Sequence, residues 1–387
     1  MTVEKILFAL FRSEICNETL LEEYKEAITP KMAGALYSIS KSHDLAHLVC
    51  ESLDKNGVLA KCGKQLEEAF CQQRQLAVCR YEQIRFEYER ICSVLEDAKI
   101  DHMPLKGAII RAFYPEPWLR TSCDIDVFIK KEELNNAIKA LTEQLDDYKL
   151  AKRTAHDISL FSGGGVHLEL HYELIENEEN VQSVLSSVWE TSKRAKDKTY
   201  CYEMNDETFY FYHVAHMAKH FLCGGCGIKP FIDLWILEHQ IPHDEKARDA
   251  LIEIGGLQTL NEKAKKLCRV WFAEQEHDEV TKQMAKFVLS GGVYGNLESR
   301  VAVQQQKKGG KIRYAFSRIF LPYNEIKVQY PVLENKKWML PFCQVCRWFR
   351  LIFKGRVRYS VRELNINAGI SQERQQEIEK LLQNLGL

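Results

Sequence analysis

The chain has 387 residues, which is enough for more than one domain of ordinary size and for a substantial core. Hydrophobic residues make up 45% of it and charged residues 28%, as in an ordinary globular protein. There are 53 lysines and arginines against 54 aspartates and glutamates, and this balance disfavours nucleic acid as a partner, because dedicated nucleic-acid binders carry a basic excess.

The N-terminal stretch MTVEKILFALFRSEIC is interrupted by Arg12 and Glu14, so it is too charged for a secretory signal or a membrane-spanning helix. No other segment reaches spanning length. The thirteen cysteines are scattered, several of them at apolar helix positions. We expect reduced thiols and a cytoplasmic protein, because secreted frameworks concentrate their cysteines in short chains.

Residues 1–98 are predicted to be helical, because LLEEYKEAI, HDLAHLVCESL and the long segment from KQLEEAF to SVLEDA repeat apolar residues every three or four positions. The pattern then changes. MPLKG (103–107) is predicted as a short strand, with a helix starting at Gly107, and CDIDVFI alternates as a strand does. An amphipathic helix is expected over 130–145, and DISLF and VHLELHYEL flank SGGG as in a β-hairpin.

From VQSVLSSVWETS onward the chain is again predicted to be helical, through TFYFYHVAHMAKHFL and FIDLWILEHQ to the C-terminal ERQQEIEKLLQNL. The order of elements predicts an α+β protein in which a small mixed sheet lies between two helical regions. We expect an N-terminal helical region over 1–98, an α/β core over 99–195 and a C-terminal helical domain over 196–387.

Two aspartates stand one residue apart in the CDIDVFI strand. Residues two apart on a strand point to the same side, so Asp124 and Asp126 project together and repel each other unless a positive charge lies between them. A divalent cation with few oxygen ligands, Mg²⁺ or Mn²⁺, suits such a pair. The alternatives are a solvent-facing edge strand, or a turn that Asp124 caps.

The surrounding motifs strengthen the metal-site interpretation. In VHLELHYEL the same alternation places His167, Glu169 and His171 on one face, which adds a third carboxylate. Upstream, Lys106 and Gly107 end a strand and begin a helix, where exposed N–H groups are suited to a polyphosphate. A metallohydrolase that uses the two histidines and Glu169 is another interpretation of the same face.

These residues resemble a known superfamily. KG, RTSCDID and VHLELH are similar to the nucleotidyltransferases with a DNA-polymerase-β-like core, and LKGAIIRAFYPEPWLRTSCDIDVFI, LELHYEL, HMAKHF and GIKPFIDLWIL resemble a bacterial group of uncharacterised nucleotidyltransferases over about residues 85–240. The chain departs from the superfamily pattern at two points. It has Gly107-Ala108 where Gly-Gly or Gly-Ser is usual, and Glu169 where Asp is commoner.

The resemblance implies an enzyme that moves a nucleoside monophosphate from an NTP, ATP being the expected donor, to a hydroxyl of an unknown small molecule or protein, with release of pyrophosphate. Asp124 and Asp126 would bridge two Mg²⁺ or Mn²⁺ ions, and Glu169 would hold the ion on the acceptor side and help to remove the hydroxyl proton. A catalytically silent nucleotide-binding or scaffold protein is the alternative, and the two departures favour it.

The resemblance also implies nucleotide contacts around the turn and on a later helix. At the turn the candidates are Lys106, Gly107, Ala108 and Arg120. Arg120 is expected either to clamp a phosphate or to form a surface ion pair, and Lys106 either to reach a phosphate or to lie on a solvated flank. The candidates on the helix are His216, Lys219 and His220.

The histidines of that helix allow three interpretations. His213, His216 and His220 share one face, and we rank hydrogen bonding between core and helical domain first, nucleotide contact second and zinc third. His171 is expected to orient Glu169. Asp233, on a largely apolar helix, is expected to have a buried partner such as Lys229, in a structural or pocket-lining role.

Two C-x-x-C pairs, CGGC (223–226) and CQVC (343–346), have the spacing of zinc ligands, but the second lies in an apolar helix, which disfavours a zinc ribbon. The 338–358 helix contains that second pair and combines aromatic residues with Arg347, Arg350, Lys354, Arg356 and Arg358. Peripheral contact with a membrane or a partner is one interpretation of it. A core helix with a solvated basic end is favoured over that.

Overall fold

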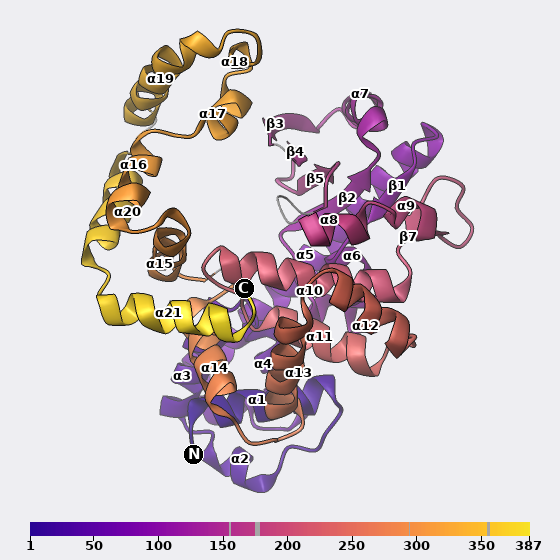
Figure 1. Ribbon diagram of the computed structural model, residues 1–387. Helices are drawn as coiled ribbons and strands as arrows, with labels where there is room; N and C mark the ends of the chain where they lie inside the picture. The colour runs from indigo at the N-terminus through magenta and orange to yellow at the C-terminus, as the bar shows by residue number, and fades with distance from the viewer. Residues whose placement is uncertain (155, 175–178, 294, 354–356) are drawn as a thin grey trace.

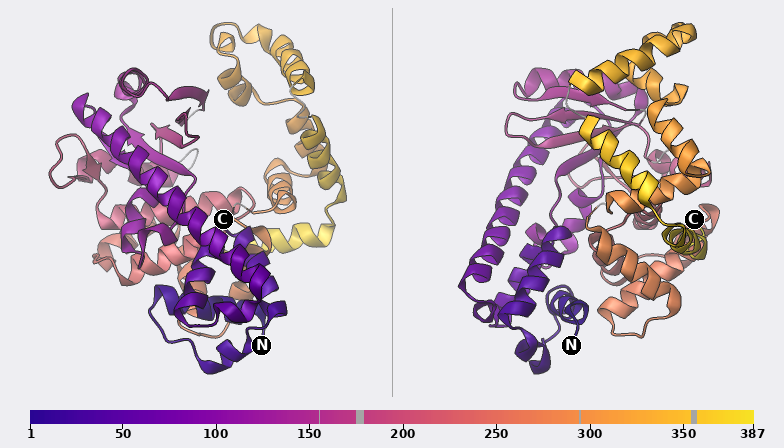
Figure 2. Two further views of the ribbon diagram at one scale, coloured as in Figure 1. Left: turned by 180° about the vertical axis from the view of Figure 1, so that it is seen from behind. Right: turned by 90° about the vertical axis from the view of Figure 1, so that its left-hand side faces the viewer.

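The computed structural model describes every residue except 155, 175–178, 294 and 354–356. A five-stranded sheet lies among helices from both ends of the chain, and a C-terminal group of helices extends away from it (Figures 1 and 2). This arrangement confirms the predicted α+β class with helical flanks. The division into three domains stays a prediction.

The N-terminal region is helical as predicted, and its longest helix leads to the sheet. Its helices are α1 (Val3–Ile15), α2 (Glu22–Ala27), α3 (Pro30–Ser42), α4 (Ala46–Lys55) and α5 (Lys64–Asp97). On α5 the buried residues Ala77, Ile84 and Ile91 recur every seven positions, which gives the helix one apolar side along its length. Figure 2 shows α5 running from the N-terminal helices to the sheet.

The sheet has the order β1-β2-β5-β4-β3. The central strands β2 and β5 are parallel, and every other neighbouring pair is antiparallel. The elements of this region are β1 (His102–Pro104), α6 (Gly107–Ile110), β2 (Asp124–Ile129), α7 (Leu134–Gln144), β3 (Lys149–Arg153), β4 (Asp157–Phe161) and β5 (His167–His171). The hairpin predicted around SGGG is β4–β5.

One face of the sheet is apolar and packed. Ile125 and Val127 of β2 and Leu168 of β5 are buried against Ile91 of α5 and Leu141 of α7. Because side chains alternate along a strand, burying these residues directs their neighbours in sequence to the other face. The alternation inferred from CDIDVFI and VHLELHYEL is therefore confirmed.

The later elements are helical apart from one small two-stranded sheet. They are α8 (Glu179–Leu185), α9 (Val188–Thr191), β6 (Lys193–Arg194), β7 (Tyr202–Glu203), α10 (Asp206–Leu222), α11 (Lys229–His239), α12 (Glu245–Ile254), α13 (Gln258–Phe272) and α14 (Glu279–Gly291). The N-terminal and C-terminal helices share one core, in which Phe8 of α1 stacks on Trp271 of α13 with 4.3 Å between ring centroids.

The last helices include a group that stands apart from the sheet (Figure 1). They are α15 (Leu297–Lys308), α16 (Lys311–Ile319), α17 (Tyr323–Gln329), α18 (Val332–Asn335), α19 (Leu340–Phe353), α20 (Val357–Gly369) and α21 (Gln372–Asn384). We call residues 311–353, from α16 to α19, the distal lobe. The helix expected over 338–358 is α19, and Lys354 and Arg356 lie outside the described residues.

Several local predictions differ from the structure. The strand β3 was not expected, because all five of its residues are exposed and KLAKR lacks the alternation of a half-buried strand. The first strand begins at His102 and ends at Pro104, at the edge of the sheet, where a residue without an N–H group is tolerated. The helix expected over 130–145 begins at Leu134, after a 3₁₀ turn.

All thirteen cysteines are free thiols. Across the described residues, no helix combines the length and the apolar character needed to cross a bilayer.

Candidate active site

The parallel pairing of β2 with β5 brings the acidic motifs together. Asp124 lies opposite His167 and Asp126 lies opposite Glu169 in the register of the two strands. All four side chains leave the face of the sheet that is not packed against α5 and α7. Neither motif determines this neighbourhood by itself, because the two strands are separated along the chain by α7 and two further strands.

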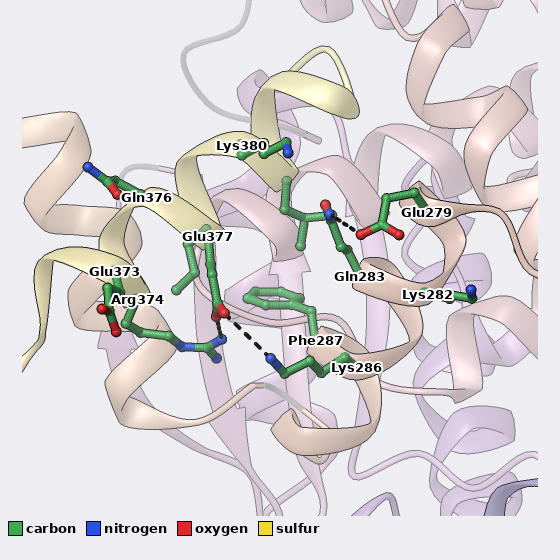
Figure 3. A pocket seen from close by; sticks show the side chains of 12 residues that line it. Glu279, Lys282, Gln283, Lys286, Phe287, Glu373, Arg374, Gln376, Glu377 and Lys380 are labelled. Carbon is green, nitrogen blue, oxygen red and sulfur yellow. Dashed lines mark hydrogen bonds and ion pairs between the residues drawn. The ribbon is translucent and has the colours of Figure 1, made fainter.

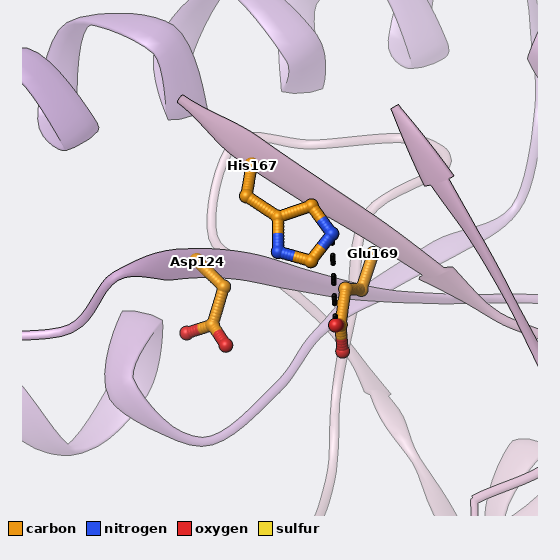
Figure 4. A group of neighbouring side chains, drawn as sticks. All are labelled: Asp124, His167 and Glu169. Atoms are coloured by element: carbon orange, nitrogen blue, oxygen red, sulfur yellow. Dashed lines mark ion pairs between the residues drawn. The ribbon is translucent and has the colours of Figure 1, made fainter. Parts of the chain in front are cut away.

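The candidate ligand atoms form two overlapping groups. One contains Asp124, His167 and Glu169 (Figure 4), and the other contains Asp126, Glu169 and His171. Within each group the atoms lie no more than 4.8 Å from one another. Glu169 belongs to both groups, and each histidine joins a different aspartate.

The two aspartates have different electrostatic environments. Burial and the neighbouring charge of Asp126 raise the pKa of Asp124 to about 6. Burial also acts to raise the pKa of Asp126, but Lys106 and His171 outweigh it and hold that pKa below its usual range. The negative charge of Asp126 is thus already balanced by Lys106 and His171, whereas the charge of Asp124 lacks comparable compensation.

Two histidines complete this face. His171 Nε2 lies 2.7 Å from Asp126 Oδ1 and 3.4 Å from Glu169 Oε2, and these contacts raise its pKa in spite of its burial. His167 Nε2 lies 3.7 Å from Glu169 Oε1, and it is a buried atom with no hydrogen-bond partner among the described residues. A nitrogen left in this way beside carboxylates is suited to a metal ion.

Lys106 lies inside the site and not on a solvated flank. Its Nζ donates to Asp126 Oδ1 at 2.9 Å, and the attraction of the carboxylates keeps its pKa above the usual range although burial acts to lower it. Its backbone has φ 47°, a conformation that costs a non-glycine residue energy. The helix that follows, α6, has only four residues, so a macrodipole at Gly107 contributes less than expected for a phosphate seat.

A cavity of about 250 Å³ opens beside the aspartates. Its walls come from α5, the turn around Gly107 and Ala108, and the start of β2. Arg111 in this wall donates from Nε to the carbonyl of Gly107 at 2.6 Å and from a terminal nitrogen to Ser122 Oγ at 2.8 Å. Burial and the nearby charge of Arg120 lower the pKa of Arg111 to about 10.

Several residues of this cavity were not predicted from the sequence, and Arg111, Tyr81 and Tyr88 are among them. Arg111 is named in no motif, and Tyr81 and Tyr88 lie on α5, thirty or more residues before the Asp124–Asp126 strand. The Arg111 guanidinium lies 5.8 Å from the Tyr81 ring centroid, within the range of a cation–π contact. The sequence offered a clue only to the two tyrosines, because their spacing of seven residues places them on one side of α5.

Arg120 and Asp233 are joined across the fold. Arg120 Nε and a terminal nitrogen donate to the two carboxylate oxygens of Asp233 at 2.7–3.0 Å, and the Tyr114 hydroxyl donates to Asp233 at 2.6 Å. The two side chains are only 14% and 2% exposed, so the surface ion pair, one of the two alternatives for Arg120, is corrected to an internal one, and the phosphate clamp stays a prediction. Lys229 is not the partner of Asp233, because it donates to Asp44 at 3.1 Å and to Thr121.

The histidines of α10 lie at the interface between helices. His213 Nε2 is 2.9 Å from the Pro230 carbonyl, and the His216 and His220 rings are in contact, with centroids 4.4 Å apart. Burial, with the charge of Lys106 as the next cause, lowers the pKa of His216, His220 and Lys219. The helix therefore lies within electrostatic reach of the site.

Tyr212 on α10 is a further group at this site that sequence reasoning missed. Its pKa rises to about 12 through burial and the charges of Asp126 and Glu169, although Lys106 acts to lower it. It precedes His213 on a helix rich in aromatic residues, so nothing in its pattern distinguishes it from a core tyrosine.

A second hollow is larger but chemically different. It lies between α14 and α21 and measures about 650 Å³ (Figure 3). Glu377 there is paired with Arg374 at 2.9 Å and with Lys286 at 3.6 Å, so its central charges are balanced within the protein. Neither the acidic motifs nor the Gly107 turn contributes to it. Cysteine is absent from the candidate metal groups found within the described part of the chain.

The mixed sheet, with a D-x-D strand and a third acid on the parallel neighbour beside a glycine turn, defines a nucleotidyltransferase core. A family model described as uncharacterised nucleotidyltransferase matches residues 30–273. The chain belongs to this family and is a transferase of phosphorus-containing groups. Comparison with curated proteins found no match. The matched residues run from α3 to α13, so the distal lobe lies outside them.

Proposed function

We propose that the protein is a metal-dependent enzyme that transfers a nucleoside monophosphate from an NTP, with ATP as the expected donor, to a hydroxyl group of a small molecule or protein. The observation that carries the proposal is the meeting of Asp124, Asp126 and Glu169 on one face of the sheet. An NTP donor and free thiols suit an enzyme of the cytoplasm, where NTPs are present and thiols stay reduced.

The residues present fit a divalent cation. Asp124, Asp126 and Glu169 are hard oxygen ligands of the kind that Mg²⁺ and Mn²⁺ prefer, and His167 offers a nitrogen, which favours Mn²⁺ over Mg²⁺. The overlap of the two groups at Glu169 supports a two-ion site. Bound there, the ions would neutralise charge on the phosphates and make the acceptor hydroxyl more acidic.

The protein's own cations would receive the triphosphate. Arg111 is half-buried, and its hydrogen bonds go to a carbonyl and a hydroxyl, so an anion in the cavity would compensate its charge. Lys106 donates to Asp126, which lines this cavity, and its side chain could turn from that carboxylate toward a bound phosphate. Tyr81 and Tyr88 offer aromatic faces for the base.

In the proposed reaction the acceptor oxygen attacks the α-phosphorus in line with the bond that breaks. Glu169 takes the hydroxyl proton, a phosphorus–oxygen bond forms, and the bridging oxygen leaves with pyrophosphate. Positioning and charge neutralisation supply most of the rate, because the chemistry requires no covalent intermediate. His171 would orient Glu169 and Asp126, and Asp233 would hold Arg120 behind the turn.

The test is release of pyrophosphate from NTPs with Mn²⁺ and a panel of hydroxyl acceptors. Asp124→Asn/Asp126→Asn should lower the rate by at least a thousandfold, because two of the three carboxylates lose their charge. Arg111→Gln should raise KM for the NTP about tenfold or more, as expected when a charge-assisted contact to phosphate is lost. Asp197→Asn, at an exposed position with φ 59° that asparagine tolerates, is the matched control.

Nucleotide binding without pyrophosphate release for any acceptor would contradict the transfer reaction and favour the silent binding protein. Tightly bound zinc at the site, with hydrolysis of the NTP and no transfer, would favour the metallohydrolase.

A further inference from the structure

The distal lobe exposes an unusual share of apolar side chains. Among the described residues, 21 large hydrophobic side chains are exposed, and eleven of them fall within residues 311–353, about a ninth of the chain. The lobe has a small core of its own, in which three hydrophobic residues are buried. Exposed apolar surface on this scale marks an interaction site and not ordinary surface.

The exposed residues of α19 form one stripe. Trp338, in the 3₁₀ turn just before α19, is followed at intervals of four, three, four and three residues by Phe342, Val345, Phe349 and Ile352 of the helix, and Phe353 beside them is 84% exposed. These intervals keep the side chains on one side of the helix along its whole length. A second stripe on α16 contains Ile312, Phe316, Ile319 and Phe320.

The opposite side of α19 is fixed to the rest of the lobe. Arg347 donates to the last carbonyls of α16, those of Arg318 at 2.7 Å and Ile319 at 2.9 Å, and Trp348 Nε1 donates to Ile319 as well. The Trp348 and Phe320 rings meet edge to face at 5.4 Å. The α19 stripe therefore stays exposed because α19 is already packed through its other side.

The charge of the lobe identifies the kind of partner. Residues 311–353 contain eight lysines and arginines and two glutamates, whereas the whole chain has a net charge of −1. Lys336 and Lys337 are exposed between α18 and α19, and Arg350 donates to the Gln329 amide oxygen instead of a carboxylate. A symmetric pairing of two such lobes would bring like charges together, which disfavours a second copy of the chain.

A hollow beside the stripe has the same amphipathic character. It measures about 960 Å³ and is lined by Trp348, Leu351 and Ile352, with Arg347 and Arg350 among its polar residues; Glu325 and Glu363 also line it, and Glu363 is paired with Arg318 at 2.9 Å. Apolar walls with arginines around them suit a molecule that has a hydrocarbon part and an anionic part.

We propose that the distal lobe binds the surface of an anionic lipid bilayer, with the α19 stripe in the interface and the lysines and arginines on lipid phosphates. Tryptophan and phenylalanine on one side of a helix with basic residues around them are typical of interfacial helices. α19 lies on the bilayer in this arrangement and does not cross it. The proposal depends on residues outside the catalytic face and is independent of the proposed reaction.

The experiment is co-flotation of the full-length chain with vesicles of phosphatidylcholine alone or of equimolar phosphatidylcholine and phosphatidylglycerol. We expect binding to the anionic vesicles, at least tenfold weaker binding to the neutral ones, and weakening by salt. Phe342→Ser/Phe349→Ser should lower the partition coefficient at least tenfold. Lys336→Glu/Lys337→Glu should lower it on anionic vesicles only.

The matched control is Leu76→Ser/Phe86→Ser on α5, at side chains that are 50% and 58% exposed but lie outside the lobe. It should bind as the unaltered chain does, and all variants should keep its circular dichroism spectrum. No binding to either vesicle, or equal loss in the control, would overturn the proposal. The proposal would also be overturned if the unaltered chain bound no vesicles and formed a dimer that Phe342→Ser/Phe349→Ser dissociates. A second copy of the chain would then be the partner that covers the α19 stripe.

Discussion

Lys106 is the residue whose replacement tests the electrostatics of the site most directly. Its Nζ lies 2.9 Å from Asp126 Oδ1, and the two side chains are 24% and 6% exposed. Lys106→Met keeps most of the volume and removes the charge, so Asp126 is left with His171 as its cationic neighbour among the described residues. The like charges of Asp124 and Glu169 then act on Asp126 with less compensation.

The magnitude follows from the burial of the pair. Breaking a buried ion pair by removing one partner costs about 3–5 kcal/mol. His171 remains 2.7 Å from the same oxygen, so we expect the low end, about 3 kcal/mol, off the free energy of unfolding of the metal-free protein. A divalent cation at the site replaces the lost charge. At a hundred times its Kd for the variant it should return about 2.7 kcal/mol, and the same concentration should stabilise the unaltered chain less, because Lys106 there repels the cation and weakens its binding.

The assay is denaturant unfolding followed by fluorescence, with EDTA and then with Mn²⁺, in the absence of nucleotide. Lys131→Met is the control, because Lys131 lies 3.4 Å from Glu173 and both side chains are exposed, at 68% and 43%. It should change stability by less than about 0.5 kcal/mol in either condition. The reasoning is refuted if Lys106→Met is as stable as the unaltered chain in EDTA, or if its loss is the same with Mn²⁺ as without.

Two further predictions concern buried groups that hold the site in place. The pKa of His47 is lowered to about 4, mainly by burial, and its Nε2 lies 2.8 Å from the Leu119 carbonyl just before the Asp124 strand. As the pH falls, the histidine is protonated in the unfolded chain before it is protonated in the folded one. The free energy of unfolding should therefore keep its full value above pH 6.5 and fall by about 3 kcal/mol as the pH drops to about 4. His47→Gln should remove this part of the pH dependence of unfolding, and an unchanged profile would contradict the assignment. Asp233→Asn should cost about 3–5 kcal/mol, because it leaves Arg120 buried without a carboxylate, whereas Arg120→Met/Asp233→Leu should regain most of that stability in the same unfolding assay. If the double variant were as unstable as Asp233→Asn alone, the unpaired Arg120 charge would not be the cause of the lost stability.

Much of the local structure could be predicted from residue patterns. The period of apolar residues identified the helices of the first 98 residues, the two motif strands and the hairpin, because burial of one side leaves a direct mark on the sequence. The same alternation placed Asp124, Asp126 and Glu169 on the side away from the core. Strand β3 escaped prediction because it is exposed on both faces and carries no such mark.

The partners of charged residues could not be predicted in the same way. Arg120 and Asp233 stand 113 residues apart, and Lys229, which is closer to Asp233 along the chain, takes Asp44 instead. Lys106 was expected either to reach a phosphate or to lie on a solvated flank, and neither alternative named Asp126, to which its Nζ donates from a residue with φ 47°. Pairing of this kind depends on which elements meet, and spacing along the chain carries little information about it.

The amino-acid sequence by itself determined the class of the fold, the face on which each acid lies and the family pattern, because these depend on periodicities of two and 3.6 residues and on short motifs. The tertiary structure alone decided that β2 and β5 are parallel neighbours, that Arg111 and two tyrosines of α5 form the wall of the cavity, and that α19 keeps an apolar stripe exposed. These features arise from contacts between segments far apart in the chain, and the energy of such contacts depends on distance in space and not on order along the chain.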